Sequence, residues 1–181
     1  MYAGHAGLAL YAKQLRPRVP MAVLVPVAFA PDWIQWALIA VGGVRNPSIS
    51  HSLVSVVAGA FVVAGAYWAV TKSRDDAAIV CLTYLSHWPA DFITAKKAFW
   101  PNSPEVGLNL YQHPVADVVV EAVVIVLCWL AYRRSLPPDS RRNPIGLAIP
   151  IGLIGLQIGF VLIQNPAVHE PLRQMMEIMA N

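Results

Sequence analysis

The sequence predicts an all-α membrane protein: a polytopic bundle of about five transmembrane helices, with a short N-terminal helix inserted into it. Of its 181 residues 57% are hydrophobic and only 13% are charged, a composition too apolar for an ordinary soluble domain. The apolar residues gather in five runs, each near the ~17–25 residues that cross a bilayer as a helix. We find no internal repeat, so a single helical bundle is expected.

The five runs are residues 19–44, 52–70, 77–93, 115–132 and 145–164. Ahead of them, residues 5–15 are apolar but too short for a ~30 Å hydrocarbon core, and at ~1.5 Å per residue they reach about the midplane. Lys13, Gln14 and Arg16 gather at the end of this segment rather than along one face, which favours insertion over an amphipathic surface helix. We therefore expect a half-spanning helix that brings His5 into the bundle.

The chain divides into three parts. Residues 1–134 hold the first four runs, and residues 135–144, "SLPPDSRRNP", form a polar turn. Residues 145–181 add the fifth run and an amphipathic tail expected at the membrane interface. Glycines 146, 152, 155 and 159 in the fifth run predict close helix packing and make it a candidate surface for membrane-protein partners.

The basic residues predict the orientation of the chain. If the runs alternate, nine Lys and Arg lie on one side (Lys13, Arg16, Arg18, Lys72, Arg74, Arg133, Arg134, Arg141, Arg142) and four on the other (Arg45, Lys96, Lys97, Arg173). By the positive-inside rule the first side is cytoplasmic. The formal charge of +3 is scattered over loops rather than gathered on one face, so nucleic acid is not an expected partner.

Ionisable side chains occur inside the apolar runs, where each costs about 2.5–3.5 kcal/mol on insertion scales and is usually functional. In "YLSHWPADFI", His87 and Asp91 are four residues apart, which places them on one helical face where they can bind one cation together. Pro89 between them predicts a kink. A buried His–Asp hydrogen bond is the alternative.

Further His and Asp residues strengthen the first interpretation. Asp32 lies within the first run, His5 precedes it, and His51 opens the second run, where it could also cap the helix. Imidazole and carboxylate ligands suit zinc, and manganese or iron less selectively. Asp117 and Glu121, one turn apart in the fourth run, are either part of the site or a structural carboxylate pair.

Four short motifs, "GHAGLAL", "APDW", "SHSL" and "LSHWPADF", resemble the YdjM-like family of bacterial inner-membrane proteins, which are described as membrane-bound metal-dependent hydrolases. The segment "VGLNLYQHPVADVVVE" is similar to one branch of that family, and the motifs cover residues 1 to about 134. The resemblance implies an inner-membrane location and a set of metal ligands: His5, Asp32, His51, His87 and Asp91. It also implies that Glu121 is a polar partner in the site, whereas Pro89 and His113 depart from the family's pattern.

The leading functional hypothesis is a zinc or other divalent-metal hydrolase acting on a lipid or another membrane-resident ester or phosphoester. Asp91 or Glu121 is the candidate general base, and His113 is the candidate general acid, unless it is simply an interfacial histidine. Alternatives are a non-catalytic subunit of a larger membrane complex that retains the metal site, and a small ion or proton translocator. The amount of metal bound to the purified protein distinguishes the hydrolase from the non-catalytic subunit.

Overall fold

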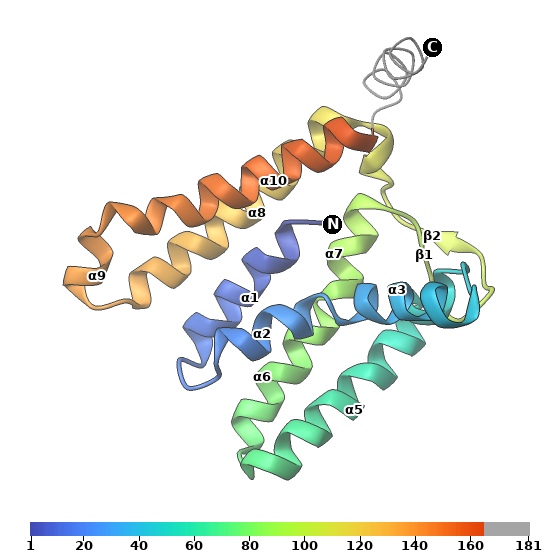
Figure 1. The fold of residues 1–181 in the computed structure, drawn as a ribbon, viewed down its shortest axis with the longest axis horizontal. Coiled ribbons are helices and arrows are strands. Elements are labelled where there is room, and N and C mark those ends of the chain that lie inside the picture. The colour runs from blue at the N-terminus through green and yellow to red at the C-terminus, as the bar shows by residue number, and fades with distance from the viewer. Residues whose placement is uncertain (165–181) are drawn as a thin grey trace, which may run out of the picture.

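The computed structural model describes residues 1–164, and this part of the chain is almost entirely helical (Figure 1). The α-helices are α1 (Gly4–Leu15), α2 (Met21–Ala28), α3 (Ala30–Gly42), α4 (Ser48–His51), α5 (Leu53–Thr71), α6 (Arg74–Leu85), α7 (His87–Thr94), α8 (Pro114–Ser135), α9 (Pro138–Arg142) and α10 (Ala148–Gln164). Two short 3-10 turns, η1 (Leu110–Gln112) and η2 (Pro144–Leu147), and one antiparallel pair, β1 (Lys97–Ala98) with β2 (Glu105–Val106), complete the described elements. The prediction of an all-α protein is confirmed.

Two of the described helices are long and apolar enough to cross a membrane singly: α5 with 19 residues and α8 with 22. They match the second and fourth predicted runs. The first run is divided into α2 and α3, which together pass the same test but are bent by 61°. The third run is divided into α6 and α7, and α10 is a shorter apolar helix. The described part of the chain therefore has two candidate spans, or three with the bent pair, where the sequence predicted five.

Proline positions account for both divided runs. A proline within a helix removes one backbone donor, and its ring clashes with the carbonyl four residues earlier. For Pro31 that residue is Val27, near the end of α2, and for Pro89 it is Leu85, the last residue of α6. The predicted kink at Pro89 is thus a break at Ser86. Each break lies next to a candidate ligand, Asp32 or His87.

Three helices start with residues that commonly begin a helix. The Ser52 hydroxyl accepts a hydrogen bond of 3.3 Å from the Ser55 backbone at the start of α5, so Ser52 rather than His51 caps this helix. Ser73 does the same for α6, accepting from the Asp76 backbone. Pro114 occupies the first position of α8, where its missing N–H is not needed.

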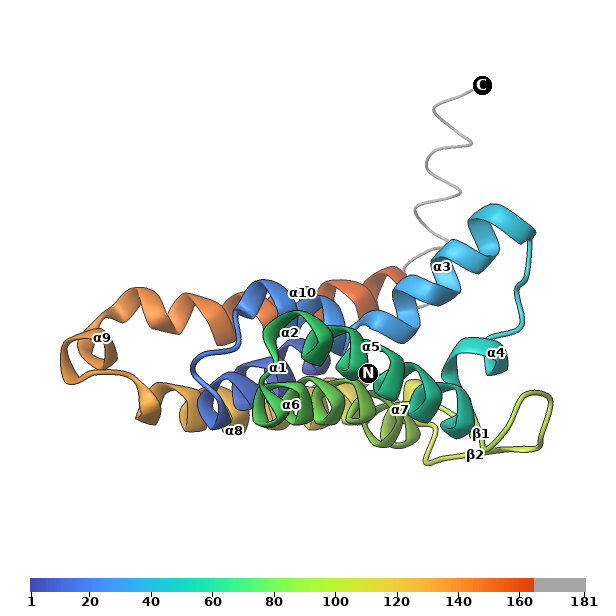
Figure 2. The ribbon, with the colours of Figure 1, turned by 90° about the horizontal axis from the view of Figure 1, so that it is seen from below.

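The helices pack as pairs around α1. The N-terminal helix contacts α8 on one side and α2 on the other, α10 runs alongside α8, and α5 runs alongside α6 (Figure 1). Buried side chains of α1, α2, α5 and α6 form the hydrophobic core, among them Ala9, Leu24, Val56, Val80 and Tyr84. The α3 helix extends away from the other helices at one edge (Figure 2).

The predicted N-terminal helix is confirmed as α1, and it is buried in the bundle rather than lying on the surface. His5, Ala9, Leu10 and Ala12 are all buried. A Cβ atom at Gly7 would lie 3.2 Å from the Cα atom of Ile125 in α8, so glycine allows this close approach. How deeply α1 enters the bilayer stays a prediction.

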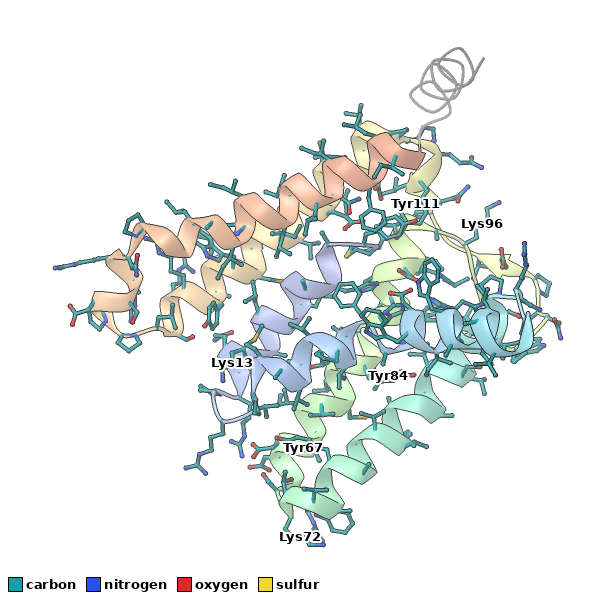
Figure 3. All side chains as sticks on the ribbon, in the orientation of Figure 1. Lys13, Tyr67, Lys72, Tyr84, Lys96 and Tyr111 are labelled. Atoms are coloured by element: carbon teal, nitrogen blue, oxygen red, sulfur yellow. The ribbon has the colours of Figure 1, made fainter. Side chains whose placement is uncertain are left out.

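Charged loop residues lie at two opposite ends of the bundle. Lys13 and Lys72 lie at one end of the molecule, and Lys96 and Tyr111 lie at the other (Figure 3). At the first end Arg16 forms ion pairs of 2.7 Å with both Asp75 and Asp76, which join α1 to the start of α6. The hydrogen bond from Arg16 lowers the pKa of the Asp76 carboxyl. This arrangement agrees with the side assignment made from the charge count.

The fifth apolar run does not use its glycines as predicted. A Cβ atom at any of Gly146, Gly152, Gly155 and Gly159 would meet no other described atom within 4 Å. The prediction of close packing at these glycines is therefore wrong within the described chain. The α10 helix contacts its neighbours through other residues, among them Gln157, which donates to Asp117 of α8. The predicted interfacial tail lies outside the described residues.

Candidate metal centre

The structure brings together all five residues predicted as metal ligands. They come from four helices: His5 from α1, Asp32 from α3, His51 from α4, and His87 with Asp91 from α7. Asp91 lies between two imidazoles, with Oδ1 3.2 Å from His5 Nε2 and Oδ2 3.3 Å from His87 Nε2. Asp32 Oδ1 lies 3.0 Å from His51 Nε2 and 3.8 Å from His87 Nε2.

The imidazole rings of His5 and His51 both contact the ring of His87. The rings of His5 and His87 are stacked with their centroids 4.0 Å apart, and the centroids of His51 and His87 are 5.1 Å apart. Two triads, His5–Asp32–His87 and His51–His87–Asp91, each offer three ligand atoms within 4.8 Å of one another. His87 belongs to both triads, so it is the central residue of the cluster.

The orientation of His87 is set by the end of α2. Its Nδ1 atom lies 2.9 Å from the carbonyl oxygen of Ala28, the last residue of α2, where helix carbonyls lack intrahelical partners. A carbonyl only accepts, so Nδ1 carries the proton and donates it. The Nε2 lone pair then faces Asp32 and Asp91. Metal-binding histidines are commonly held by such a second hydrogen bond.

A chain of hydrogen bonds sets the tautomer of His51. The Gln35 amide donates to the carbonyl of Val44 over 3.1 Å, so its oxygen accepts from the Ser50 hydroxyl over 2.8 Å. The Ser50 oxygen in turn accepts from His51 Nδ1 over 2.7 Å. In the neutral imidazole, the Nε2 lone pair of His51 therefore faces the Asp32 carboxylate 3.0 Å away, and a second proton on the ring or a cation between the two groups would satisfy both acceptors.

The cluster is buried except on one side. Side-chain exposure is 1% for His5 and His87, 6% for Asp91 and 7% for His51, but 35% for Asp32. Two cationic groups lie beside Asp91: Lys97 Nζ at 2.6 Å and the amino group of Met1 at 2.5 Å. Burial raises the pKa of the nearby Tyr111 hydroxyl, and the negative charge of Asp91 raises it further. This hydroxyl therefore stays protonated.

The donor set fits a divalent metal ion. His5 Nδ1 and His87 Nε2 are buried with no hydrogen-bond partner among the described residues, since the 3.3 Å approach of Asp91 to His87 lacks hydrogen-bond geometry. Unpartnered buried nitrogens of this kind are uncommon and are suited to hold a metal ion. Three imidazoles and two carboxylates suit zinc best and provide enough donors for one ion or for two.

Glu121 and Asp117 have separate partners next to the cluster. The Glu121 carboxylate accepts from the backbone N–H groups of Tyr2 and Gly4 at 2.9 Å each, at the start of α1, where helix N–H groups lack intrahelical acceptors. Asp117 accepts from the Gln157 amide at 2.8 Å, and the Gln157 oxygen accepts from Ala3 over 3.3 Å. The two carboxylates thus tie α8 and α10 to α1. Glu121 forms no ion pair with the five cluster residues.

His113, the proposed general acid, lies at the N-cap of α8 with an exposed side chain. The structure does not bring it into the cluster, so its catalytic role stays a prediction without geometric support. The sequence reasoning also missed Lys97, Ser50 and Gln35. Lys97 was counted only as a loop charge, although its place shortly after α7 was a signal. Ser50 directly precedes His51 in the sequence, which could have indicated it, whereas no neighbouring residue indicated Gln35.

Together the helices and the cluster define an α-helical membrane protein with a buried histidine–aspartate centre. A family model described as YdjM inner membrane protein matches residues 2–167, and the chain belongs to this family. The match includes α10, which the sequence motifs did not cover. No curated protein and no solved structure matches the chain.

Proposed function

We propose that this protein is a metal-dependent hydrolase that cleaves a lipid or another membrane-resident ester or phosphoester. The observation that supports the proposal most is the facing of unprotonated imidazole nitrogens and carboxylate oxygens in one buried cluster, at 3.0–3.8 Å. His5, Asp32, His51, His87 and Asp91 would hold the metal, most suitably zinc. When bound, such an ion lowers the pKa of a water ligand and polarises the bond to be cleaved.

The remaining roles in the proposed reaction belong to side chains of the cluster and its neighbours. Of the two proposed bases, Asp91 is the better placed, because it lies within the histidine cluster, whereas Glu121 is bonded to the backbone of α1. Lys97 lies 2.6 Å from Asp91 and offers a positive charge to the anionic oxygens of a phosphoester. His87 and His51 keep the tautomers that their hydrogen bonds to Ala28 and Ser50 impose, so both present lone pairs to the centre.

The direct test combines metal content with hydrolysis in labelled water. Purified protein is assayed by mass spectrometry for zinc, then incubated in H₂¹⁸O with vesicles of phosphatidylethanolamine and phosphatidylglycerol. We expect near-stoichiometric zinc, and ¹⁸O in a carboxylate or phosphate product that His87→Ala does not form. Wild-type protein without bound metal would contradict the proposal.

The second candidate function is a non-catalytic subunit of a larger membrane complex. It is favoured by the open glycine face of α10, at which a side chain would meet no described atom, since small residues allow another helix to approach. Metal-free protein that co-purifies stoichiometrically with a membrane partner would favour this candidate over the hydrolase.

We further propose that the bundle crosses the inner membrane five times with the cluster on the outer side. Lys13 and Lys72 lie at the same end of the molecule, and Lys96 lies at the opposite end (Figure 3). This placement supports the proposed orientation, together with the positive-inside rule. A single cysteine placed at Ser140, with Cys81 and Cys128 replaced by serine, should resist an impermeant thiol reagent added to intact cells. Labelling at that position would contradict the proposed orientation.

A further inference from the structure

A cavity of about 370 Å³ lies directly beside the cluster, between α1, α2, α3 and α10. Its walls include Tyr2, Phe29, Asp32, Trp33, Leu153 and Phe160. The rings of Tyr2 and Phe160 are stacked with centroids 4.5 Å apart and planes at 7°, so α10 and the start of α1 form a continuous aromatic wall.

Asp32 is the point where this cavity meets the metal centre. It lines the cavity, its side chain is the most exposed of the five ligands at 35%, and its Oδ1 atom lies 3.0 Å from His51. Asp32 is also the one charged residue among those that line the cavity. A ligand in the cavity would therefore place an apolar part against aromatic rings and a polar group beside Asp32.

The outer wall of the cavity is apolar and exposed. Trp33 is 62% exposed, Leu156 61% and Phe160 44%, and all three line the cavity. In a helical membrane protein such surfaces face lipid rather than water. The cavity is thus accessible sideways, between α3 and α10, to a molecule already dissolved in the bilayer.

We propose that this cavity binds one hydrocarbon chain of a membrane lipid and places the ester or phosphoester group of that lipid beside Asp32. The proposal rests on the proposed function for the statement that the bound lipid is the substrate. A volume of about 370 Å³ is at the lower end of the ~300–1,000 Å³ typical of ligand pockets, which favours one chain over the two chains of a diacyl lipid. The inner face of α10 would then select the chain.

Photo-crosslinking tests the site without relying on activity. The full-length protein is reconstituted in phosphatidylcholine vesicles that contain phosphatidic acid with a diazirine in one acyl chain, irradiated, and mapped by peptide mass spectrometry. We expect labels on α3 and on the α10 residues that line the cavity. Leu153→Trp, which fills the cavity, should lower this labelling several-fold. Ile151→Trp is the matched control, because Ile151 is on the same helix, 68% exposed and outside the lining.

Two results would overturn the proposal: Leu153→Trp labelled as strongly as wild type, or labels spread evenly over the lipid-facing helices. If Leu153→Trp fails to fold, Leu156→Trp at the cavity rim replaces it and should again lower labelling. Zinc is measured in every sample. Metal-free protein that is still labelled in the cavity refutes the hydrolase but supports the lipid site. Zinc-loaded protein without cavity labelling refutes the lipid site alone.

Discussion

Two buried polar clusters lie near the N-terminal end of α1, and they differ in how their atoms are matched. In the anchor cluster, made of Glu121, Asp117 and Gln157, carboxylate and amide oxygens accept from N–H groups, although Asp117 Oδ1 has no partner among the described residues. In the metal centre, made of His5, Asp32, His51, His87 and Asp91, imidazole lone pairs face carboxylates, and two nitrogens have no partner among the described residues. Burial of a charged group in an apolar helix is common to both.

We therefore assign a structural role to the anchor cluster and a functional role to the metal centre. The insertion cost of about 2.5–3.5 kcal/mol per charge applies to Glu121 as much as to Asp91, so the cost alone identifies no site. The distinguishing feature is that imidazole nitrogens lie opposite carboxylate oxygens in the metal centre, where a cation between two acceptors satisfies both. The anchor cluster should therefore affect stability, and the metal centre should affect metal binding.

The largest effect is expected from removing a ligand. His87→Ala and His5→Ala should each remove most of the bound zinc, because both residues are buried in the same cluster. Elemental analysis of the purified variants measures this, with Glu121→Gln as a control that keeps its zinc. If His5→Ala retained zinc while His87→Ala lost it, the role of α1 in the centre would be refuted.

A smaller loss is expected at the residue that sets the tautomer of His51. Ser50→Ala removes the acceptor 2.7 Å from Nδ1, and loss of such second-shell partners typically lowers metal affinity ~10–100-fold. Competition with a zinc-binding dye measures the affinity. Ser55→Ala, at the third residue of α5, is the matched control and should leave the zinc affinity unchanged. Equal affinities in Ser50→Ala and wild type would show that the hydrogen-bond chain does not orient the ligand.

A substitution in the anchor cluster should lower the stability of the fold and leave the zinc stoichiometry unchanged. Glu121→Gln replaces a carboxylate that accepts from Tyr2 and Gly4, and hydrogen bonds to charged groups are worth ~1.5–3 kcal/mol. We expect the free energy of unfolding to fall by about that amount in detergent, with zinc stoichiometry kept in the folded protein. Loss of zinc without loss of stability would assign Glu121 to the metal centre instead.

The smallest effect is expected at the partly buried pair of Arg16 and Asp76, which serves as a reference outside both clusters. Arg16 lowers the pKa of Asp76 in the folded protein, so the pair stabilises the fold above the unfolded pKa of about 4 and less as pH falls below it. Arg16→Gln should therefore melt slightly earlier than wild type at pH 7, with the difference shrinking toward pH 3. A difference that grew at low pH would contradict this assignment.

The sequence alone determined the features that depend on neighbours along the chain. The helical class follows from apolar runs, and the breaks beside Asp32 and His87 follow from Pro31 and Pro89, because ring geometry acts within one turn. The pairing of His87 with Asp91 follows from their spacing on one helical face. The places of His5, Asp32 and His51 in or beside apolar runs indicated these three residues, the motif resemblance implied them as ligands, and the structure brings the five residues together. Their role as metal ligands stays a proposal.

Only the tertiary structure decided which distant groups meet. Glu121 accepts from the start of α1, Lys97 turns back to Asp91, and Gln35 reaches Ser50. The α10 helix closes the cavity beside Asp32, while its glycines face outward. Hydrophobic periodicity tells which face of a helix is buried but not which helix covers it. The partner depends on bends such as the 61° between α2 and α3, and these are settled when all the helices pack together.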